Sequence, residues 1–324
     1  MRIVITGGAG FLGRKLARRL LERGALTEAS GRERAIDELL LLDVVAAQGF
    51  DDPRVRTLAG DIADPAVIGN ALDGGVDSVF HLAAIVSGEA EQDFDLGWRV
   101  NFDATRLLLE RCRALRSTPK VLFTSSCAVF GGALPAVVPD TQQLTPQSSY
   151  GAQKSCGEFL VGDYTRKGMI DGRSVRLPTV SVRPGKPNKA ASSFASGIIR
   201  EPLNGVDAIC PVGPQTGMWL TSPRTVIDNI VAAHEAPASA FGASRSINLP
   251  GFSTTVAGMI EALVRVAGAD VAARITLRHD PAIDRIVRTW PVDFDTAFAR
   301  SLGMRADADF DGVIRQYIDD ELKR

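Results

Sequence analysis

The chain has 324 residues, of which 45% are hydrophobic and 23% are charged, as in an ordinary globular protein. Its 37 basic and 38 acidic residues leave a formal net charge of −1, so we expect neither nucleic acid nor an anionic membrane as a partner. The length is typical of about two domains.

Local composition disfavours secretion, membrane insertion and metal binding. The first residues, Met-Arg-Ile-Val-Ile-Thr-Gly-Gly, form a short apolar run that glycines interrupt, unlike a secretory signal. The apolar run at 39–42 is far shorter than the roughly 20 residues that cross a bilayer. Four cysteines are scattered without a C-x-x-C pair, so we expect reduced thiols, no zinc site and a cytoplasmic location.

Short aliphatic runs alternate with longer helical patterns in the first half of the chain. The expected strands are 2–6, 39–44, 55–58, 78–82, 120–124 and 174–177. The expected helices are 10–23, 64–72, 96–115 and 150–167, where apolar residues recur three and four positions apart. This alternation predicts βαβ units and therefore an α/β fold with a doubly wound parallel sheet.

The composition changes after Arg183. Several prolines and glycines between 184 and 223 indicate loops and short helices, and a helix at 224–236 and a strand at 246–249 follow. We therefore predict a first domain from 1–183 plus about 224–250. A smaller, discontinuous, mixed α/β lobe from about 184–223 plus 251–324 should cover the carboxyl edge of the sheet, where open α/β sheets hold ligands.

The first strand runs into a glycine-rich turn. Gly7, Gly10 and Gly13 have the spacing G-x-x-G-x-x-G, directly after the strand and ahead of a helix. Glycine permits a tight turn and lets backbone amides, including those of Phe11 and Leu12, approach a pyrophosphate. An ordinary turn is the alternative, but the position between strand and helix favours a dinucleotide site.

Acidic residues follow the second and third strands. Asp43 ends the second strand, where a carboxylate accepts hydrogen bonds from the ribose hydroxyls and repels a 2′-phosphate, which favours NAD over NADP. It lies further from the glycines than the usual ~20 residues because 27–37 reads as a polar insertion. Asp61 and Ile62 are candidates to hold the adenine edge, although Asp61 can instead cap the next helix.

The strand at 78–82 ends in small residues. Leu82, Ala83 and Ala84 would let a cofactor lie close to the backbone. His81 has no spaced His, Cys or carboxylate partner, which favours a structural role over metal binding. Asn101 either caps the following helix or contributes to the cofactor site.

Hydroxyl groups gather at the end of the strand at 120–124, where Ser125 and Ser126 follow. Tyr150 and Lys154 are four residues apart and therefore share one face of a helix. A nearby ammonium lowers a tyrosine pKa from its ordinary value of about 10, which makes the phenol a usable proton-transfer group near neutrality.

In this order, the motifs resemble the extended short-chain dehydrogenase/reductase family, also called the NAD-dependent epimerase/dehydratase family. The resemblance covers about 1–183 and, more loosely, 224–249. It implies a Rossmann-type fold, NAD as cofactor, and a homodimer formed through the helices at 101–115 and 150–167. The motifs are the glycine turn, Asp43, Asp61, Asn101, Ser-Ser-Cys-Ala at 125–128 and Tyr150-x-x-x-Lys154.

The resemblance also implies roles for individual residues. Tyr150 is the general acid/base, Lys154 binds the nicotinamide ribose and lowers the tyrosine pKa, and Ser126 hydrogen-bonds the reacting oxygen. Ser125 faces the cofactor. The other implied contacts are Pro178 and Val180 with the cofactor, and Thr179, Arg183 and Ser193 with the substrate.

Two stretches bear on the substrate. Dehydratases of the family usually carry Thr-Asp-Glu where this chain has Ser125-Ser126-Cys127, which disfavours elimination. The segment 181–194 gathers cations and hydroxyls suited to a sugar-acid carboxylate, which one cation of 183–189 would anchor, although a solvated basic loop is the alternative. This segment, residues 200–203 and the chain length carry a closer resemblance within the family. It implies NAD-dependent oxidation of the C2 hydroxyl of a four-carbon sugar acid.

Two other functions stay open. A nucleotide-sugar 4-epimerase has the same Ser/Tyr/Lys set and holds NAD tightly, but it gives no net NADH. A non-enzymatic sensor on the same fold binds a dinucleotide and a protein partner. Such sensors commonly lose the tyrosine or the lysine, so the intact Tyr150 and Lys154 disfavour that function.

Overall fold

The computed structural model describes residues 1–185 and 190–322. Its first domain contains a seven-stranded parallel sheet with the order β12-β8-β7-β6-β1-β4-β5, which confirms the predicted doubly wound fold. The strands are β1 (Arg2–Thr6), β4 (Glu38–Asp43), β5 (Val55–Ala59), β6 (Ser78–His81), β7 (Lys120–Ser126), β8 (Asp171–Leu177) and β12 (Ser246–Asn248).

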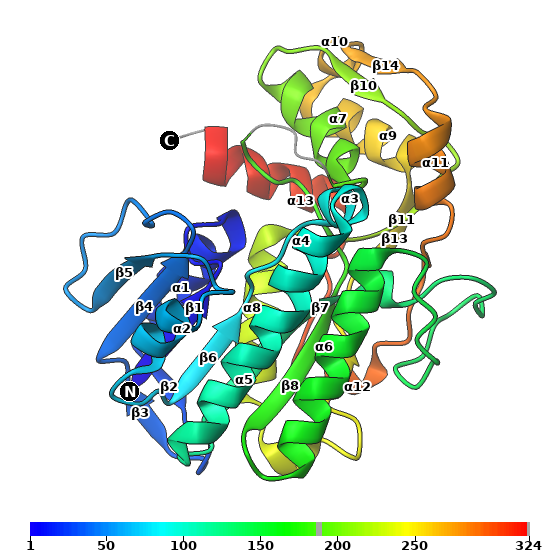
Figure 1. Cartoon of the computed structure of the whole chain (residues 1–324). Coiled ribbons are helices and arrows are strands. Elements are labelled where there is room, and N and C mark those ends of the chain that lie inside the picture. The colour runs from blue at the N-terminus through cyan, green and yellow to red at the C-terminus, as the bar shows by residue number, and fades with distance from the viewer. Residues whose placement is uncertain (186–189, 323–324) are drawn as a thin grey trace.

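Helices cover both faces of this sheet, which is why its strands read as continuous apolar runs. In β1, Ile3 and Ile5 point into one core, and Val4 between them points into the other. Figure 1 shows the two helical layers. One layer contains α1 (Phe11–Arg23) and α8 (Pro223–Glu235), and the other contains α2 (Pro65–Leu72), α5 (Ala104–Leu115) and α6 (Ser149–Arg166).

The structure begins β8 three residues earlier than predicted, at Asp171. Its first residues are polar and hide the strand from an apolar pattern, yet the Arg173 side chain is fully buried. Arg173 pairs with Asp171 at 2.7 Å and donates to the His234 carbonyl at 2.6 Å, which replaces part of the hydration that burial removes. The polar insertion at 27–37 belongs to a hairpin of β2 (Ala25–Thr27) and β3 (Glu33–Ala35).

The helix predicted at 96–115 begins earlier. It starts with α4 (Phe94–Trp98), continues through the π-helical η1 (Arg99–Asp103) and ends as α5. The Asp93 side chain caps α4 by accepting a hydrogen bond from the Leu96 amide. Asn101 lies inside η1, so the alternative in which Asn101 caps this helix is wrong.

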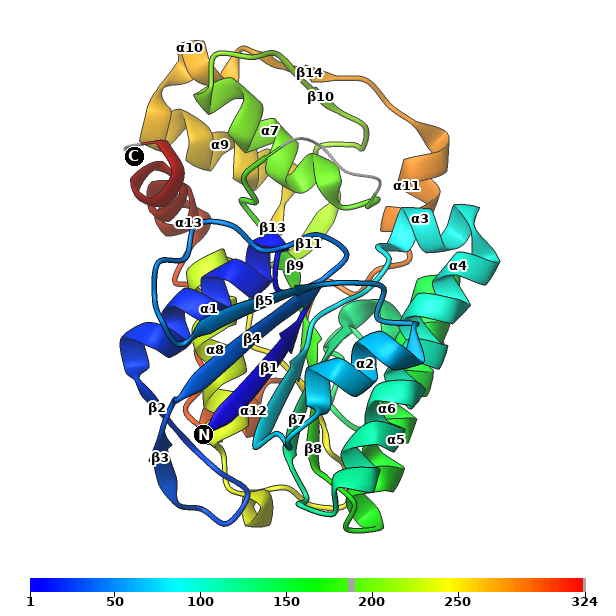
Figure 2. The ribbon, with the colours of Figure 1, turned by 60° about the vertical axis from the view of Figure 1, so that its left-hand side comes forward.

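The second lobe lies beyond the carboxyl ends of the strands, and Figure 2 shows β1 running toward it from the amino terminus. A three-stranded sheet of β9 (Thr179–Val180), β11 (Gly217–Thr221) and β13 (Phe252–Thr255) connects the lobe to the chain that leaves β8. The other elements are α7 (Ser193–Leu203), β10 (Ala208–Cys210), α9 (Val256–Ala267), α10 (Ala269–Ala272), β14 (Ile275–Leu277), α11 (Pro281–Val287), α13 (Phe310–Tyr317) and η4 (Ile318–Leu322).

The lobe has its own apolar core, and the division into two domains stays a prediction. One segment departs from that division. Ala299 of α12 (Ala297–Ser301) and the nearby Met304 pack in the core of the first domain. Within the parts of the chain that the structure describes, no helix has both the length and the apolar character needed to cross a bilayer.

Candidate active site

The glycine turn joins β1 to α1 where the strand order reverses, since β4 lies on one side of β1 and β6 on the other. Ligands bind open α/β sheets at such a point. Gly7 has a φ of +72°, and a Cβ there would lie 2.8 Å from the Ala83 nitrogen. A Cβ at Gly13 would lie 2.1 Å from the Gly7 carbonyl oxygen. Larger residues therefore cannot occupy the turn unless the backbone moves.

The surroundings of the turn fit a dinucleotide. At Gly10, no side chain of the described residues caps α1, so the amides of Phe11 and Leu12 are placed to receive a pyrophosphate. The Asp43 carboxylate accepts hydrogen bonds from the Ala9 amide at 3.0 Å and the Gly10 amide at 3.2 Å. These bonds hold an acidic group beside the turn, where a ribose would lie.

Asp61 follows β5 and pairs with Arg99 at 2.5 Å, and this hydrogen bond lowers the pKa of Asp61. Helix α2 is capped instead by Asp64, whose side chain accepts from the Ala66 amide. The alternative in which Asp61 caps this helix is therefore wrong. The neighbouring Ile62 is buried in the core between the sheet and α2.

His81 is structural, and its contacts define its protonation. Because Nε2 carries the proton of the neutral ring, Nδ1 of His81 accepts from the Thr6 hydroxyl at 2.7 Å, and the Thr6 oxygen also accepts from the Ala83 amide at 3.2 Å. The Thr105 hydroxyl donates to the Asn101 carbonyl and accepts from Nε2 at 2.9 Å. Burial lowers the pKa of His81 to about 3, so the ring is neutral. Nowhere in 1–185 or 190–322 do three His, Cys, Asp or Glu residues gather as metal ligands.

Asn101 ties the loop after β6 to the helix that carries Tyr150 and Lys154. Its side chain exchanges two hydrogen bonds with the Ile85 backbone, at 2.8 and 3.1 Å. It also donates to the Gln153 side chain at 2.7 Å. Because Leu82, Ala83 and Ala84 precede Ile85, these bonds help to fix the segment predicted to lie along the cofactor.

The structure brings Ser126, Tyr150 and Lys154 together at the carboxyl end of β7. Ser148 caps α6 by accepting from the Gly151 amide at 3.2 Å, and the helix then packs against β7 and β8 (Figure 1). The Ser126 hydroxyl acts on the Tyr150 phenol and lowers its pKa. The Lys154 ammonium lies 5.6 Å from the centre of the Tyr150 ring.

Burial is the largest influence on the ionisation of Tyr150 and Lys154. It raises the pKa of Tyr150 to about 12, against the opposing effects of the Ser126 hydroxyl and the charge of Arg183. It lowers the pKa of Lys154 to about 7, against the charge of Glu158. The Lys154 ammonium donates to the Thr124 carbonyl at 2.8 Å, and desolvation is the largest effect on the Tyr150 phenol. That Lys154 lowers the tyrosine pKa stays a prediction.

Ser125 faces a buried ion pair. Its hydroxyl donates to Oε1 of Glu158 at 2.5 Å, and Arg176 donates to both oxygens of the same carboxylate. The Ser125 side chain is therefore committed to Glu158, which leaves the backbone of Ser125 for a cofactor contact. Sequence reasoning missed Glu158, although it follows Lys154 at the four-residue spacing that identified Tyr150 and Lys154.

Arg183 approaches this site from the start of the lobe, after Pro178 and strand β9, which contains Thr179 and Val180. The positive charge of Arg183 acts on the Tyr150 phenol. No carboxylate in the described residues pairs with the Arg183 guanidinium, and the charges that act on it are those of Arg200 and Tyr150. The other predicted cations, Lys186 and Lys189, lie outside the described residues.

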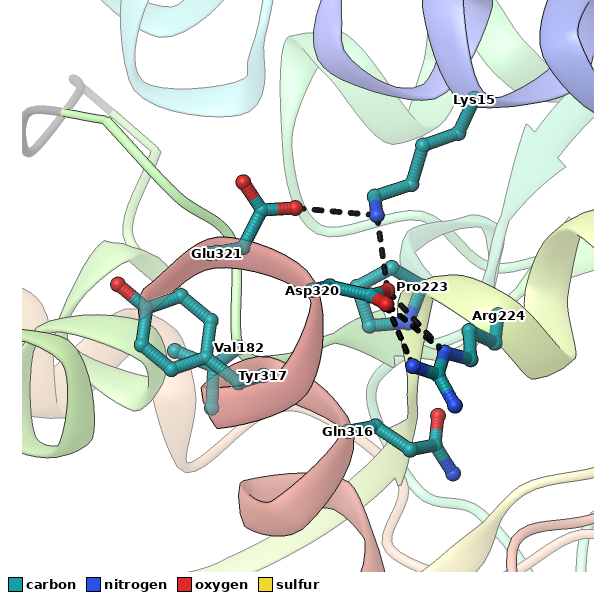
Figure 3. Close-up of a pocket in the computed structure, with 8 residues that line it drawn as sticks. All are labelled: Lys15, Val182, Pro223, Arg224, Gln316, Tyr317, Asp320 and Glu321. Atoms are coloured by element: carbon teal, nitrogen blue, oxygen red, sulfur yellow. Dashed lines mark hydrogen bonds and ion pairs between the residues drawn. The ribbon is translucent and has the colours of Figure 1, made fainter. Parts of the chain in front are cut away.

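A second cluster of charges joins α1 to the end of the lobe. Figure 3 shows Lys15 between Asp320, at 3.1 Å, and Glu321, at 3.0 Å. Arg224 of α8 binds Asp320 at 2.5 Å. The Lys15 ammonium also lies 5.3 Å from the centre of the Phe11 ring, so this cluster connects the glycine turn to η4. The sequence did not predict it.

Known proteins resemble this chain in sequence and in fold. The chain is 58% identical to a D-erythronate dehydrogenase from Cupriavidus necator, over 99% of this chain and 98% of that protein. It is 46% identical to a D-erythronate dehydrogenase from Haemophilus influenzae, over 99% of this chain and all of that protein.

A crystal structure described as a nucleoside-diphosphate-sugar epimerase from Agrobacterium tumefaciens has a TM-score of 0.93 and 40% identity, covering 100% of this chain and 95% of that chain. The sequence profile of the NAD dependent epimerase/dehydratase family matches residues 3–220. With its glycine turn at the switch point and its Ser126, Tyr150 and Lys154 at the end of β7, the chain belongs to the NAD dependent epimerase/dehydratase family.

Proposed function

We propose that the protein oxidises the C2 hydroxyl of D-erythronate to 2-dehydro-D-erythronate, with NAD as the acceptor. The observation that carries this proposal is the similarity, over nearly the whole chain, to two D-erythronate dehydrogenases. The geometry supports this proposal. The positive charge of Arg183 acts on the Tyr150 phenol, and no carboxylate among the described residues pairs with Arg183. A small carboxylate substrate would supply the missing counter-charge.

The side chains divide the reaction between them. Tyr150 accepts the proton of the C2 hydroxyl, Ser126 hydrogen-bonds the same oxygen, and Arg183 binds the carboxylate. Lys154 holds the nicotinamide ribose. Bound NAD supplies the hydride acceptor, which no side chain can replace.

The cofactor contacts follow the edge of the sheet. The glycine turn and the start of α1 hold the pyrophosphate, Asp43 holds the adenosine ribose, and Asp61 and Ile62 border the adenine. The segment 82–84 and Asn101 lie along the middle of the cofactor. The nicotinamide end is bordered by Pro178, Val180 and the backbone of Ser125, and the substrate contacts also include Thr179 and Ser193.

Asp43→Asn should weaken NAD binding by about 10- to 100-fold, since a hydrogen bond to a charged group contributes ~1.5–3 kcal/mol. The discrimination against NADP should fall as well, because the carboxylate that repels a 2′-phosphate is lost. Titration calorimetry with both dinucleotides measures this. Asp51→Asn, in an exposed loop of the same domain, is the matched control. Unchanged NAD affinity in the Asp43 variant would exclude the ribose contact.

The substrate is tested by mixing the pure protein with NAD and a panel of C4–C6 sugar acids and UDP-sugars. We expect NADH absorbance to rise with D-erythronate and to be weak or absent with longer acids. Signal from UDP-sugars alone, or from no compound, would contradict the proposal. Conversion of a UDP-sugar without net NADH would identify the 4-epimerase instead, but the relatives with higher identity are named dehydrogenases.

We further propose a cytoplasmic homodimer. All four cysteines are unpaired, as expected in a reducing compartment. In α6, one of the two helices expected to form the interface, Phe159 is 67% exposed, which is a large apolar area for a surface helix. Light scattering of the pure protein distinguishes a dimer from a monomer.

A further inference from the structure

We propose that Ser196 and Arg200 of α7 position Arg183 for binding the substrate carboxylate. This inference rests on the proposed oxidation of a sugar acid and adds two residues to it. Neither residue is predicted to touch the substrate, and both act through the backbone of Arg183.

Three hydrogen bonds join the segment 181–183 to α7. The Arg183 amide donates to the Ser196 hydroxyl at 3.1 Å, and the Arg183 carbonyl accepts from Nη1 of Arg200 at 2.7 Å. The Ser181 hydroxyl donates to the Ala195 carbonyl at 2.8 Å. Both backbone polar groups of Arg183 are therefore held by side chains of one helix. This fixes where its side chain leaves the backbone.

The spacing and burial of the two residues suit this role. Ser196 and Arg200 are four residues apart, so they share one face of α7, and they are only 1% and 6% exposed. Arg200 also donates from Nη2 to Glu201 at 2.5 Å, which partly offsets its loss of hydration. The planar guanidinium spans a carbonyl on one side and a carboxylate on the other, a geometry that lysine cannot reproduce.

The charges of this region favour an anion. Two guanidinium groups, those of Arg183 and Arg200, lie close enough to interact, and Glu201 is the one carboxylate paired with either in the described residues. Burial lowers the pKa of Arg183, and the charge of Arg200 lowers it further, but an arginine stays charged at neutral pH. A bound carboxylate relieves this repulsion, whereas a neutral polyol does not.

The test measures kcat and KM for D-erythronate in Arg200→Gln, Arg200→Lys and Ser196→Ala. We expect Arg200→Gln to raise KM by on the order of 10- to 100-fold, because small misplacement of an anchoring group has effects of that size. Ser196→Ala, which removes one small hydroxyl, should raise KM by about tenfold. Arg200→Lys should recover only part of the loss. NAD affinity should be unchanged in all three, and Arg265→Gln, on the exposed face of α9, should match the wild type.

Two further measurements separate positioning from a general structural role. The methyl ester of the substrate lacks the negative charge, so its kcat/KM should be insensitive to Arg200→Gln. In an Arg183→Gln background, Arg200→Gln and Ser196→Ala should have little further effect on KM, because the group that they position is gone.

The positioning role would be overturned if Arg200→Gln lowered kcat/KM equally for the acid and its methyl ester. It would also be overturned if the effects of Arg200→Gln and Ser196→Ala on KM added fully to the effect of Arg183→Gln. Either result would leave the proposed function standing. A wild-type protein that oxidises no sugar acid would overturn both.

Discussion

Tyr150→Phe should lower kcat for sugar-acid oxidation by about 10²- to 10⁴-fold, the range typical of losing a general acid/base. The variant keeps the aromatic ring but lacks the oxygen that accepts the C2 proton. NAD affinity should change little, because the glycine turn and Asp43 lie at the other end of the predicted cofactor site. NADH formation measures turnover, and calorimetry measures NAD binding.

The matched control is Tyr164→Phe. Tyr164 lies on the same helix, α6, but its phenol donates to Glu110 of α5, away from Ser126 and Lys154. This variant should keep wild-type kcat. Substantial turnover by Tyr150→Phe, or equal losses in the two variants, would refute the role of Tyr150.

The same phenol sets the pH dependence. With the pKa of Tyr150 raised to about 12, the basic form is a small fraction at neutrality and grows as pH rises. The kcat/KM for oxidation should therefore increase with pH above 7, at most about tenfold per unit while Tyr150 remains mainly protonated. A bound NAD carries a positive nicotinamide, so the ternary complex should reach its plateau at lower pH than the free protein. A flat profile from pH 7 to 10 in kcat/KM would argue against Tyr150 as the base.

Glu158→Gln should reduce the free energy of unfolding by about 3–5 kcal/mol, the usual effect of removing one partner of a buried ion pair. Glu158 and Arg176 pair at 2.8 Å with side chains 2% and 5% exposed, so the variant leaves a guanidinium charge in the interior. Ser125 also loses the carboxylate that accepts its hydroxyl. Denaturant unfolding, followed by circular dichroism, measures the loss.

Two other variants make this result interpretable. Asp163→Asn breaks a surface ion pair between Asp163 and Arg166, with side chains 59% and 71% exposed. It should lower the free energy of unfolding by less than about 1 kcal/mol. Glu158→Gln combined with Arg176→Met removes both charges and should recover part of the lost stability. If Glu158→Gln were as stable as Asp163→Asn, the buried pair would not stabilise the fold.

Local signals in the sequence were enough to predict the frame of the site. The strands β1, β4, β6 and β7 are apolar on both faces, and turns and helices follow them at regular intervals, so their order predicts a parallel sheet. The glycine turn and the pair Tyr150 and Lys154 depend on spacing along one chain segment. Spacing of this kind can be read without knowing the fold.

Other features depend on residues that are distant in the sequence. The sequence left two roles for Asn101, a helix cap or a cofactor contact. It could not decide between them because the hydrogen-bond partners of Asn101, Ile85 and Gln153, are 16 and 52 residues away. The beginning of β8 was missed because the burial of Arg173 requires Asp171 and the distant His234 carbonyl. Periodicity describes apolar faces and carries no information on such buried polar partners.

The amino-acid sequence thus determined which groups reach the carboxyl edge of the sheet: the glycines, Asp43, Ser126, Tyr150 and Lys154. Only the tertiary structure decided how those groups ionise and what holds them. Burial raises the pKa of Tyr150, where a neighbouring lysine alone would lower it. The Ser125 hydroxyl donates to Glu158, and side chains of α7 hydrogen-bond the backbone of Arg183. The reason is physical: desolvation and hydrogen bonding depend on all neighbours in space, whereas a sequence motif specifies only neighbours along the chain.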